Sequence, residues 1–417
     1  MDKEKLLPSL RFSGYKDAWE KNKLEHYLDV SNEKNVNGVY SIYDVLSVSG
    51  DFGVVNQIEF QGRSFAGASV TNYGVANTLN VIYTKSPLKN NPYGIIKTNK
   101  GKTGIVSVLY GIFHAKNNVY TPFIQNYFEQ TARVNNYLRP LVNKGAKNTL
   151  LISDEDSLNG EVHFPSLVEE QKAIGLFFDS LDNLITLHQN EYDKFLIMKK
   201  AMLEKLFPKE GMNVPEIRFN GFTEPWERRK LGDIVERVVR KNTNNESNLP
   251  LTISALYGLV DQITYFNNRI ASRDVSNYYL VINGEFAYNK SSSAGFPFGA
   301  VKRLDLHEKG VLSTLYIVFA IKDSEEINSD FLTVFFDTDR WHKGVAERAC
   351  EGARNHGLLN ISADDFFDID LCLPKSEKEQ AVIGTYMRKL DNLITLQQRK
   401  IEKLKNIKAG CLEKMFV

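Results

Sequence analysis

Two stretches of the chain carry apolar side chains at alternating steps of four and three residues. These steps run from Ile174 to Leu206 and again from Ile383 to Met415. Such steps form the a/d seam of a heptad repeat, so each stretch is predicted to be a long helix that packs against another helix. The apolar seam positions are Ile174, Phe178, Leu181, Ile185, Phe195, Met202 and Leu206 in the first stretch and Ile383, Met387, Leu390, Ile394, Ile401, Leu404 and Met415 in the second.

A seven-residue string indicates that the two stretches are copies of each other. Leu181–Leu187 reads LDNLITL, and the same letters return at Leu390–Leu396, a shift of 209 residues (390 − 181). The polar seam step Lys199 returns at the same shift as Lys408. A helix of roughly 40 residues is about 60 Å long, too long to be buried in one small domain. We therefore expect the two helices to pack on each other as a rod; the alternative is two unrelated helices, each lying on its own domain.

The repeat extends through the rest of the chain. Leu7–Leu24 and Val214–Leu231 share Pro, Arg-Phe, Gly and Trp-Glu at the same spacing, with a shift of 207 residues (214 − 7). Because the shift changes only by small steps along the chain, the whole sequence is a tandem duplication. The predicted segments are a first domain at 1–162, a first long helix at 163–211, a second domain at 212–370 and a second long helix at 371–417.

Inside the domains, short runs rich in β-branched and aromatic residues alternate with Gly and Asn turns. Examples are VVNQIEF, LNVIYT and VSVLYGIF, which predict strands. Helical patterns occur around Phe123–Leu141 and Phe331–Arg348. We predict an α+β fold for each domain, with a twisted, mainly antiparallel sheet.

Composition excludes several classes of protein. With 42% hydrophobic residues, 25% charged residues and a net charge of +1, the chain is neither disordered nor histone-like, although a local basic groove stays open. No apolar run reaches the length of a membrane span, and the N-terminus has no signal-peptide core, so we expect a cytoplasmic protein without membrane contact. The three cysteines form no C-x-x-C pair and are expected to be reduced thiols.

Motifs of catalytic sites are missing from the sequence. Gly101-Lys102-Thr103 lacks the glycine that a phosphate-binding loop needs five residues earlier, where Ile96 stands. Asn91-Pro92-Tyr93 lacks the second proline of the adenine-methyltransferase tetrapeptide. The histidines show no metal-ligand spacing. We predict no catalytic residue, no metal site and no cofactor on this chain.

Taken together, the repeated motifs resemble those of the DNA-specificity subunit of type I restriction–modification systems, over essentially the whole chain. Besides the two LDNLITL strings, the motifs that carry the resemblance are the W-E-x-x-K-L openings (Trp19–Leu24 and Trp226–Leu231), the helix entries ending in Q-x-x-I-G (Pro165–Gly175 and Pro374–Gly384) and the Gly-Ala-(Lys/Arg)-Asn turns (Gly145–Asn148 and Gly352–Asn355).

This resemblance implies two tandem target-recognition domains separated by an antiparallel coiled coil. Each domain would read one half of an asymmetric, bipartite site in double-stranded DNA. The subunit itself would be non-catalytic. It would bind two methyltransferase subunits, which methylate adenine N6 with S-adenosylmethionine, and could join restriction subunits that use ATP and Mg²⁺ to translocate and cut DNA. Phe177, an aromatic residue off the seam, either contacts the methyltransferase or packs under the adjacent domain.

Candidate DNA contacts come from turns that combine Lys, Arg, Asn and Ser. Each such residue taken alone is more typical of a solvated loop, and the duplicated placement of the turns weakens that interpretation. Positions alike in both domains are expected to serve tasks common to both halves, such as phosphate binding: Lys85, Lys97, Lys147, Lys290, Lys302 and Arg354. Positions that differ are expected to read bases: Lys89, Asn90, Lys100, Lys102, Ser292, Ser293 and His356.

Two other functions compete with a specificity subunit. One is a free-standing, repressor-like DNA-binding protein that needs no catalytic partner, which co-purification with a methyltransferase would distinguish. The other is an enzyme with an unrecognised site, which methylation or cleavage of DNA by the isolated chain would support.

Overall fold

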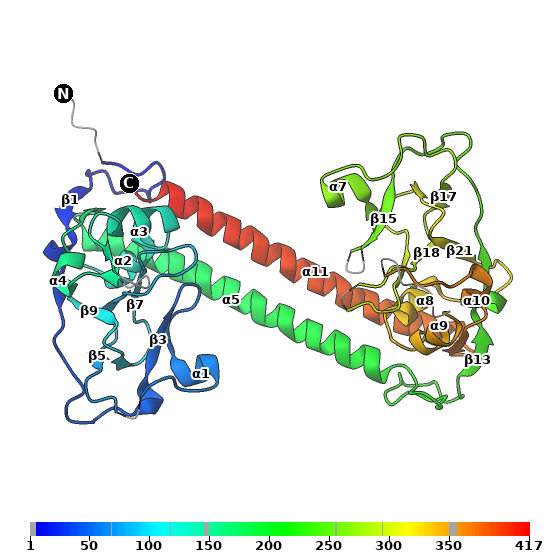
Figure 1. Cartoon of the computed structure of the whole chain (residues 1–417), viewed down its shortest axis with the longest axis horizontal. Helices are drawn as coiled ribbons and strands as arrows, with labels where there is room; N and C mark the ends of the chain where they lie inside the picture. The colour runs from blue at the N-terminus through cyan, green and yellow to red at the C-terminus, as the bar shows by residue number, and fades with distance from the viewer. Residues whose placement is uncertain are drawn as a thin grey trace. The chain divides into compact units, whose positions relative to one another are not determined.

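The computed structural model describes residues 6–67, 69–116, 118–145, 150–254, 257–293, 295–349 and 357–417. The chain forms two compact units: unit 1 comprises Met1–Gln189 and Arg399–Val417, and unit 2 comprises Asn190–Gln398. Each unit therefore contains one globular domain and part of each of the two long helices, α5 (Val168–Lys205) and α11 (Glu377–Lys414). Figure 1 shows both helices as continuous ribbons.

The domain of unit 1 is built around a four-stranded antiparallel sheet in the order β2-β9-β6-β7. Antiparallel pairs β1-β12, β3-β4, β5-β8 and β10-β11 accompany it, and helix α2 packs on β6 and β7. The strands are β1 (Glu20–Lys23), β2 (Leu28–Val30), β3 (Leu46–Ser49), β4 (Gly53–Asn56), β5 (Gly74–Ala76), β6 (Val81–Thr84), β7 (Ile95–Thr98), β8 (Gly104–Val106), β9 (Tyr110–Ala115), β10 (Asn143–Lys144), β11 (Leu150–Leu151) and β12 (Glu161–Phe164). The short helices are α1 (Gln57–Gln61), α2 (Thr121–Tyr127), α3 (Thr131–Leu138) and α4 (Asp154–Ser157).

The domain of unit 2 repeats this topology. Its four-stranded antiparallel sheet has the order β14-β21-β18-β19, and the pairs β13-β22, β15-β16 and β17-β20 correspond to three pairs of unit 1. The strands are β13 (Glu227–Lys230), β14 (Val235–Arg237), β15 (Leu251–Ser254), β16 (Gly258–Asp261), β17 (Tyr279–Ile282), β18 (Phe286–Asn289), β19 (Ala300–Arg303), β20 (Lys309–Leu312), β21 (Ile317–Ile321) and β22 (Asp370–Leu373). The short helices are α6 (Leu231–Ile234), α7 (Gln262–Phe266), α8 (Ser329–Phe336), α9 (His342–Arg348) and α10 (Ala363–Phe367). The predicted α+β class with mainly antiparallel sheets is confirmed.

The long helices are shorter than the segments expected from the sequence. Each has 38 residues, and the residues just before them form strands β12 and β22 instead. Pro165 and Pro374 directly follow these strands, and Pro208 lies shortly after the end of α5. Proline is disfavoured inside a helix, so these residues mark the boundaries of the long helices. Both helices have acidic residues in the first turn and a lysine in the last, which suits the helix dipole.

Two predicted strands are partly wrong. The run VSVLYGIF is divided by a turn between β8 and β9. Of the run VVNQIEF, only the first three residues belong to β4, and the rest forms α1. The side chain of Asn56 accepts hydrogen bonds from the backbone N–H groups of Ile58 (3.0 Å) and Glu59 (3.1 Å). This N-cap stabilises a helical turn where the apolar alternation alone favoured a strand.

The end of one long helix completes each domain core. In unit 1, Phe416, just beyond α11, packs edge-on against Trp19 with ring centroids 6.1 Å apart. In unit 2, Phe207, just beyond α5, does the same against Trp226 at 5.8 Å. The four rings are almost fully buried. Each domain core is therefore built from a local segment and from a helix end that is distant in the sequence.

Within each unit, α5 and α11 lie side by side and run in opposite directions (Figure 1). In unit 2, Gln397 donates a hydrogen bond to Glu191, and Lys199 pairs with Asp391. A later residue of α5 thus contacts an earlier residue of α11, as antiparallel helices require. The apolar seam positions predicted from the heptads are all buried or half-buried. The long helices thus agree with the predicted antiparallel coiled coil.

Candidate functional site

Three of the predicted DNA contacts of unit 1 lie in the turns that flank β7. Lys89 and Asn90 lie in the turn between β6 and β7, and Lys102 lies in the turn between β7 and β8; all three are exposed. The backbone oxygen of Asn90 accepts a hydrogen bond of 3.0 Å from the side chain of Asn135. These side chains can reach a ligand in solvent from an ordered turn, as base contacts require.

Two other predicted contacts of unit 1 have carboxylate partners within the unit. The Lys85 ammonium lies 2.7 Å from Oδ1 of Asp154, and Lys100 forms an ion pair with Asp179 on α5. The side chains of Lys85 and Lys100 are 17% and 32% exposed. A DNA phosphate would therefore compete with the carboxylate for each ammonium. Their assignment as DNA contacts stays a prediction.

Lys97 and Lys302, expected to bind phosphates, lie inside the units instead. Lys97 is only 5% exposed, and its Nζ lies 2.7 Å from Oε2 of Glu129. Lys302 pairs in the same way with Oδ1 of Asp337 at 2.6 Å. A phosphate would have to displace a carboxylate from a largely buried pair, at a high desolvation cost. The structure thus gives this duplicated pair an internal partner, and its duplication is explained by packing.

Three predicted contacts of unit 2, Lys290, Ser292 and Ser293, lie in the turn that follows β18. Nζ of Lys290 donates to the backbone oxygen of Ile361 at 3.3 Å, and Oγ of Ser292 donates to the backbone oxygen of Gly357 at 2.8 Å. Ser293 is exposed. The remaining predicted contacts, Lys147, Arg354 and His356, lie outside the described residues.

An ion pair that the sequence did not predict joins the first segment of each unit, which contains Arg11 or Arg218, to a long helix. In unit 1, the Arg11 guanidinium makes two hydrogen bonds to Glu170 on α5, with Nε–Oε1 at 2.6 Å and Nη2–Oε2 at 2.7 Å. Nε1 of Trp19 donates to the same carboxylate at 3.4 Å. The Glu170 hydrogen bond raises the pKa of Arg11 above its ordinary value, although burial opposes this. The opening segment is thereby fastened to the start of the long helix.

Unit 2 contains the same ion pair at the matching positions. Arg218 makes the two corresponding hydrogen bonds to Glu379 on α11, at 2.7 and 2.8 Å, and Nε1 of Trp226 donates to that carboxylate at 3.2 Å. Both glutamates are almost completely buried. The repeated arginine and tryptophan of the openings therefore have a structural task in each unit.

The glutamine and glycine of the Q-x-x-I-G entries also serve packing. Oε1 of Gln380 accepts a hydrogen bond from the backbone N–H of Asn328 at 2.9 Å, while its Nε2 donates to the backbone oxygen of Pro374 at 3.0 Å. A Cβ atom at Gly384 would lie 2.7 Å from the backbone nitrogen of Phe331. Only glycine allows α8 to approach α11 this closely. Gln171 makes the equivalent two hydrogen bonds in unit 1.

The LDNLITL strings divide into an inward and an outward side. Leu181 and its copy Leu390 are buried on the seam, whereas other leucines of the string are exposed. The exposed leucines are Leu184 (43%) and Leu187 (53%) in unit 1 and Leu393 (41%) and Leu396 (47%) in unit 2. Both copies of the string therefore expose apolar side chains to solvent at matching positions.

A second matched surface escaped the sequence-based prediction. In unit 1, Phe52 lies in the turn between β3 and β4 and Phe60 lies on α1; both are exposed, and their ring centroids are 5.3 Å apart. In unit 2, the positions shifted by 205 residues (257 − 52) are Tyr257, in the turn between β15 and β16, and Tyr265 on α7, which are also exposed. The segment after each of these helices is held by a glutamine. Oε1 of Gln57 accepts a hydrogen bond from the backbone N–H of Phe65 in unit 1, and Oε1 of Gln262 accepts from Ile270 and Ala271 in unit 2. The repeated glutamine was the signal that could have indicated this surface.

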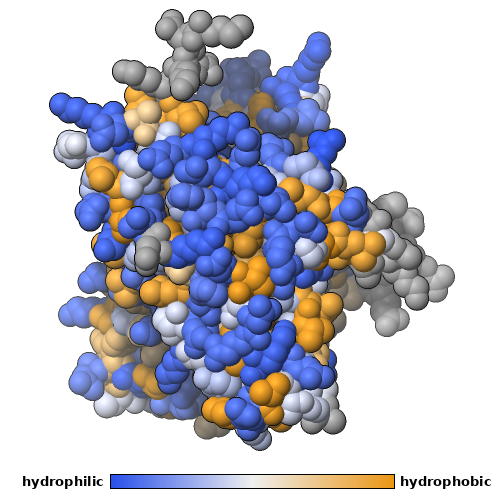
Figure 2. Space-filling view, turned by 90° about the vertical axis from the view of Figure 1, so that its left-hand side faces the viewer, coloured by the Kyte–Doolittle hydropathy of each residue, from blue (hydrophilic) through white to orange (hydrophobic). Residues whose placement is uncertain are grey.

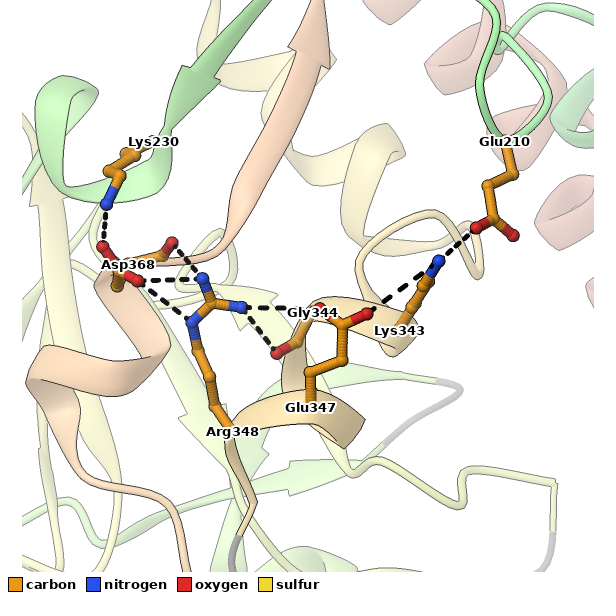
Figure 3. Close-up of polar contacts among 7 residues, drawn as sticks. All are labelled: Glu210, Lys230, Lys343, Gly344, Glu347, Arg348 and Asp368. Atoms are coloured by element: carbon orange, nitrogen blue, oxygen red, sulfur yellow. Dashed lines mark hydrogen bonds and ion pairs between the residues drawn. The ribbon is translucent and has the colours of Figure 1, made fainter.

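A cavity of about 420 Å³ in unit 2 lies between the end of α5 and helix α9. Figure 3 shows the ion pairs near it: Lys343 with Glu210 and Glu347, and Arg348 and Lys230 with Asp368. Because each of these cations already has a carboxylate partner, the cavity is not an evident binding site for an anion.

The described residues contain neither a membrane-spanning helix nor a metal-binding cluster. Figure 2 shows a face of unit 1 on which hydrophilic residues predominate and hydrophobic ones form separate groups. Among the described residues, no helix is long and apolar enough to cross a membrane. Within the same ranges, no group of three or more His, Cys, Asp or Glu side chains is arranged to hold a metal ion.

Comparisons with known proteins agree with the repeated architecture. Residues 223–406 match the family model described as the type I restriction modification DNA specificity domain. A crystal structure of the type-I restriction-modification system S subunit from M. genitalium is similar, with a TM-score of 0.54 at 13% sequence identity over 99% of both chains. The HsdS subunit from Thermoanaerobacter tengcongensis has a TM-score of 0.45 at 14% identity over 97% of this chain and 98% of its own. No curated protein matches the sequence. The family match bears out the resemblance inferred from the repeated motifs for residues 223–406. The M. genitalium structure agrees in fold over nearly the whole chain.

Proposed function

We propose that this chain, whose residues 223–406 belong to the type I restriction–modification DNA specificity domains, is the non-catalytic specificity subunit of such a system. Each unit would read one half of an asymmetric, bipartite site in double-stranded DNA. The helix pair would set the spacer and bind two methyltransferase subunits. The chain itself would carry no cofactor.

The observation that supports this proposal best is one architecture used twice with different turns. The two sheets have the same strand order and are joined to the helices by the same Arg–Glu pairs. The turns that follow the matching strands β6 and β18 differ: unit 1 presents Lys89 and Asn90, whereas unit 2 presents Ser292 and Ser293. Similar domains with different polar turns suit two half-sites of different sequence, because base edges differ in their donors and acceptors.

DNA geometry gives the expected spacing of the two half-sites. Two domains that enter the major groove on one face of B-DNA are about one helical turn, or 10 bp, apart. If each domain reads roughly 3–5 bp, the unread spacer is about 5–8 bp. Each long helix of 38 residues spans about 57 Å, which is longer than one helical turn of B-DNA, about 34 Å.

The exposed leucines support a partner rather than a free-standing DNA-binding protein. Leu184 and Leu187 and their copies in unit 2 keep apolar area in solvent at matching positions of both units. A duplicated surface suits two copies of one partner, here the methyltransferase subunits. These subunits would supply S-adenosylmethionine-dependent methylation of adenine N6, and restriction subunits, where present, would supply ATP- and Mg²⁺-dependent cleavage.

Methylome sequencing tests the proposal. Cells that express this chain with its cognate methyltransferase are compared with cells that lack the chain. We expect a new N6-methyladenine motif in two parts with a fixed spacer of about 5–8 bp. If the two proteins associate and no bipartite motif appears, the proposal is wrong.

Matched variants then assign a half-site to each unit. Lys89→Ala should relax one half of the motif, by about 1–3 kcal/mol at one base pair if the lysine reads a base. Ser293→Ala should affect only the other half. Equal loss over both halves would mean that these side chains do not read bases.

A further inference from the structure

Four charged side chains in unit 1 connect the domain to both long helices. Nζ of Lys97 on β7 lies 2.7 Å from Oε2 of Glu129, and Oε1 of Glu129 lies 3.7 Å from Nζ of Lys408 on α11. Nζ of Lys408 lies 2.7 Å from Oδ1 of Asp182 on α5. The charges alternate along this chain of contacts, which we call the four-charge cluster. It joins a strand, the segment after α2 and the helix pair.

Unit 2 contains a second four-charge cluster with the same order of charges. Lys302 on β19 lies 2.6 Å from Asp337, and the other oxygen of Asp337 lies 3.4 Å from Nζ of Lys199 on α5. Lys199 is 2.7 Å from Oδ1 of Asp391 on α11. The two helices have exchanged tasks: α11 provides the lysine in unit 1, and α5 provides it in unit 2.

The clusters fix one register of the antiparallel helices. From Asp182 to Lys199 α5 advances by 17 residues (199 − 182), and from Lys408 to Asp391 α11 goes back by 17 residues (408 − 391). The two aspartates are the second residues of the LDNLITL strings, and the two lysines are polar steps of the heptad seams. The exact repeat of these letters therefore has a reason in helix pairing.

A lysine on an apolar seam is a costly way to stabilise a helix pair. Removing an ammonium and a carboxylate from water opposes folding, and hydrophobic residues of similar volume often stabilise such a site as well or better. Polar residues at single seam positions instead select register and partner. Burial alone would lower the pKa of Lys199, but Asp337 and Asp391 raise it above its ordinary value, so the lysine stays charged. The ion pairs therefore act at every physiological pH.

We propose that Lys199 and Lys408 are positioning residues that hold each DNA-reading domain in one orientation on the helix pair and so restrict the spacer length accepted in the DNA site. Each lysine touches the acid of its domain and the aspartate of the opposite helix. Losing the charge removes this contact and loosens the orientation of the domain on the helices, while the Arg–Glu pairs and the apolar contacts still hold the domain in place. This inference rests on the proposed function.

The test uses the complete methyltransferase complex and DNA duplexes that carry the bipartite motif found by methylome sequencing. Spacers of native length and of one base pair more or less are methylated in parallel. In the Lys199→Met/Lys408→Met variant, we expect the preference for the native spacer to fall by about tenfold, within the range of coupling in one salt-bridge network. Methionine preserves the length and apolar packing of the side chain.

Two further double variants separate charge from general damage. Lys199→Arg/Lys408→Arg keeps both charges and should keep the spacer preference of the wild type. Lys194→Met/Lys403→Met removes matched charges from exposed positions of the same helices and should also leave the preference unchanged. The arginine variant changes the same two positions but retains their charge. The Lys194/Lys403 variant loses the same number of charges but leaves both four-charge clusters intact.

The outcomes distinguish this inference from the proposed function. If wild-type complex yields no bipartite motif, the proposed function fails before the variants matter. If the wild type reads a bipartite site and the methionine variant keeps the same spacer preference, the inference is overturned. It is equally overturned if methylation falls in parallel for all spacers, because that result shows a structural role alone.

Discussion

Replacing Gly384 by alanine tests whether the repeated Q-x-x-I-G entry exists for packing. A Cβ atom here would lie 2.7 Å from the backbone nitrogen of Phe331 and 2.8 Å from Cβ of Asp330. Ordinary contacts begin at 3.4 Å, so the first turn of α8 has to move by about 0.7 Å (3.4 − 2.7). Backbone atoms cannot move aside as a flexible side chain can, so the strain falls on the helix itself.

Three contributions give the expected magnitude. Alanine favours the helix over glycine by about 1 kcal/mol. Overpacking opposes this by about 1–3 kcal/mol. The displaced Phe331 N–H also weakens its 3.1 Å hydrogen bond to the capping side chain of Asn328, which costs about 1 kcal/mol. We expect a net loss of about 1–3 kcal/mol in the free energy of unfolding of unit 2.

Gly410→Ala is the control, because no atom lies within 4 Å of its would-be Cβ and the equivalent residue of α5 is Ala201. It should stabilise the chain by about 0.5–1 kcal/mol. Urea unfolding of the full chain by circular dichroism gives the stability, and hydrogen exchange of the α8 amides assigns the loss to unit 2, since two units need not unfold together. The reasoning is refuted if Gly384→Ala is as stable as the wild type or is stabilised as Gly410→Ala is.

Three further predictions concern ion pairs and the outward leucines. Glu379→Gln removes the charge that binds Arg218 and should lower the free energy of unfolding by about 2–3 kcal/mol, with Glu170→Gln giving a similar loss in unit 1; equal thermal stability of variant and wild type would contradict this. Leu393→Asp should leave the circular dichroism spectrum unchanged, because the side chain is exposed, yet reduce co-purification with the methyltransferase; retained binding would argue against docking there. Burial would raise the pKa of Asp337, but its lysine partners lower it below 3.8, so the unfolded state binds the proton first as pH falls. The stabilisation from this carboxylate is therefore complete above about pH 4 and is lost as pH falls through the lowered folded-state pKa, and Asp337→Asn should flatten this acid limb in unfolding measured against pH.

Local patterns predicted the long helices, but less precisely their ends. The heptad steps placed the seam on the buried side, because a helix fixes which residues share a face. The predicted segments began at 163 and 371, inside what are strands β12 and β22. Each strand has only four residues, and three residues separate it from the helix, so the strand is too short to show a period of its own. Only the prolines at 165 and 374 marked the boundary.

Candidate contacts were predicted less well than the fold. Lys97 and Lys302 belong to matched polar turns in the sequence, yet they pair with Glu129 and Asp337, 32 and 35 residues further along the chain. A spacing pattern describes neighbours in sequence, whereas an ion pair depends on where the chain returns. The exposed turn residues Lys89 and Asn90 kept the placement that a solvent-facing ligand contact needs.

The sequence by itself determined the tandem duplication, the two long helices with their seams, the α+β class and the family resemblance, and that resemblance implied the antiparallel direction of the helices. These follow from periodicity and from repeated letters, which are local properties of the chain. The tertiary structure decided which repeated letters hold the fold: the Arg–Glu pairs span 159 and 161 residues, and the four-charge clusters join segments from three parts of the chain. Such contacts depend on chain folding over long distances, because a buried charge is stabilised by its partner in space rather than by its neighbours in sequence.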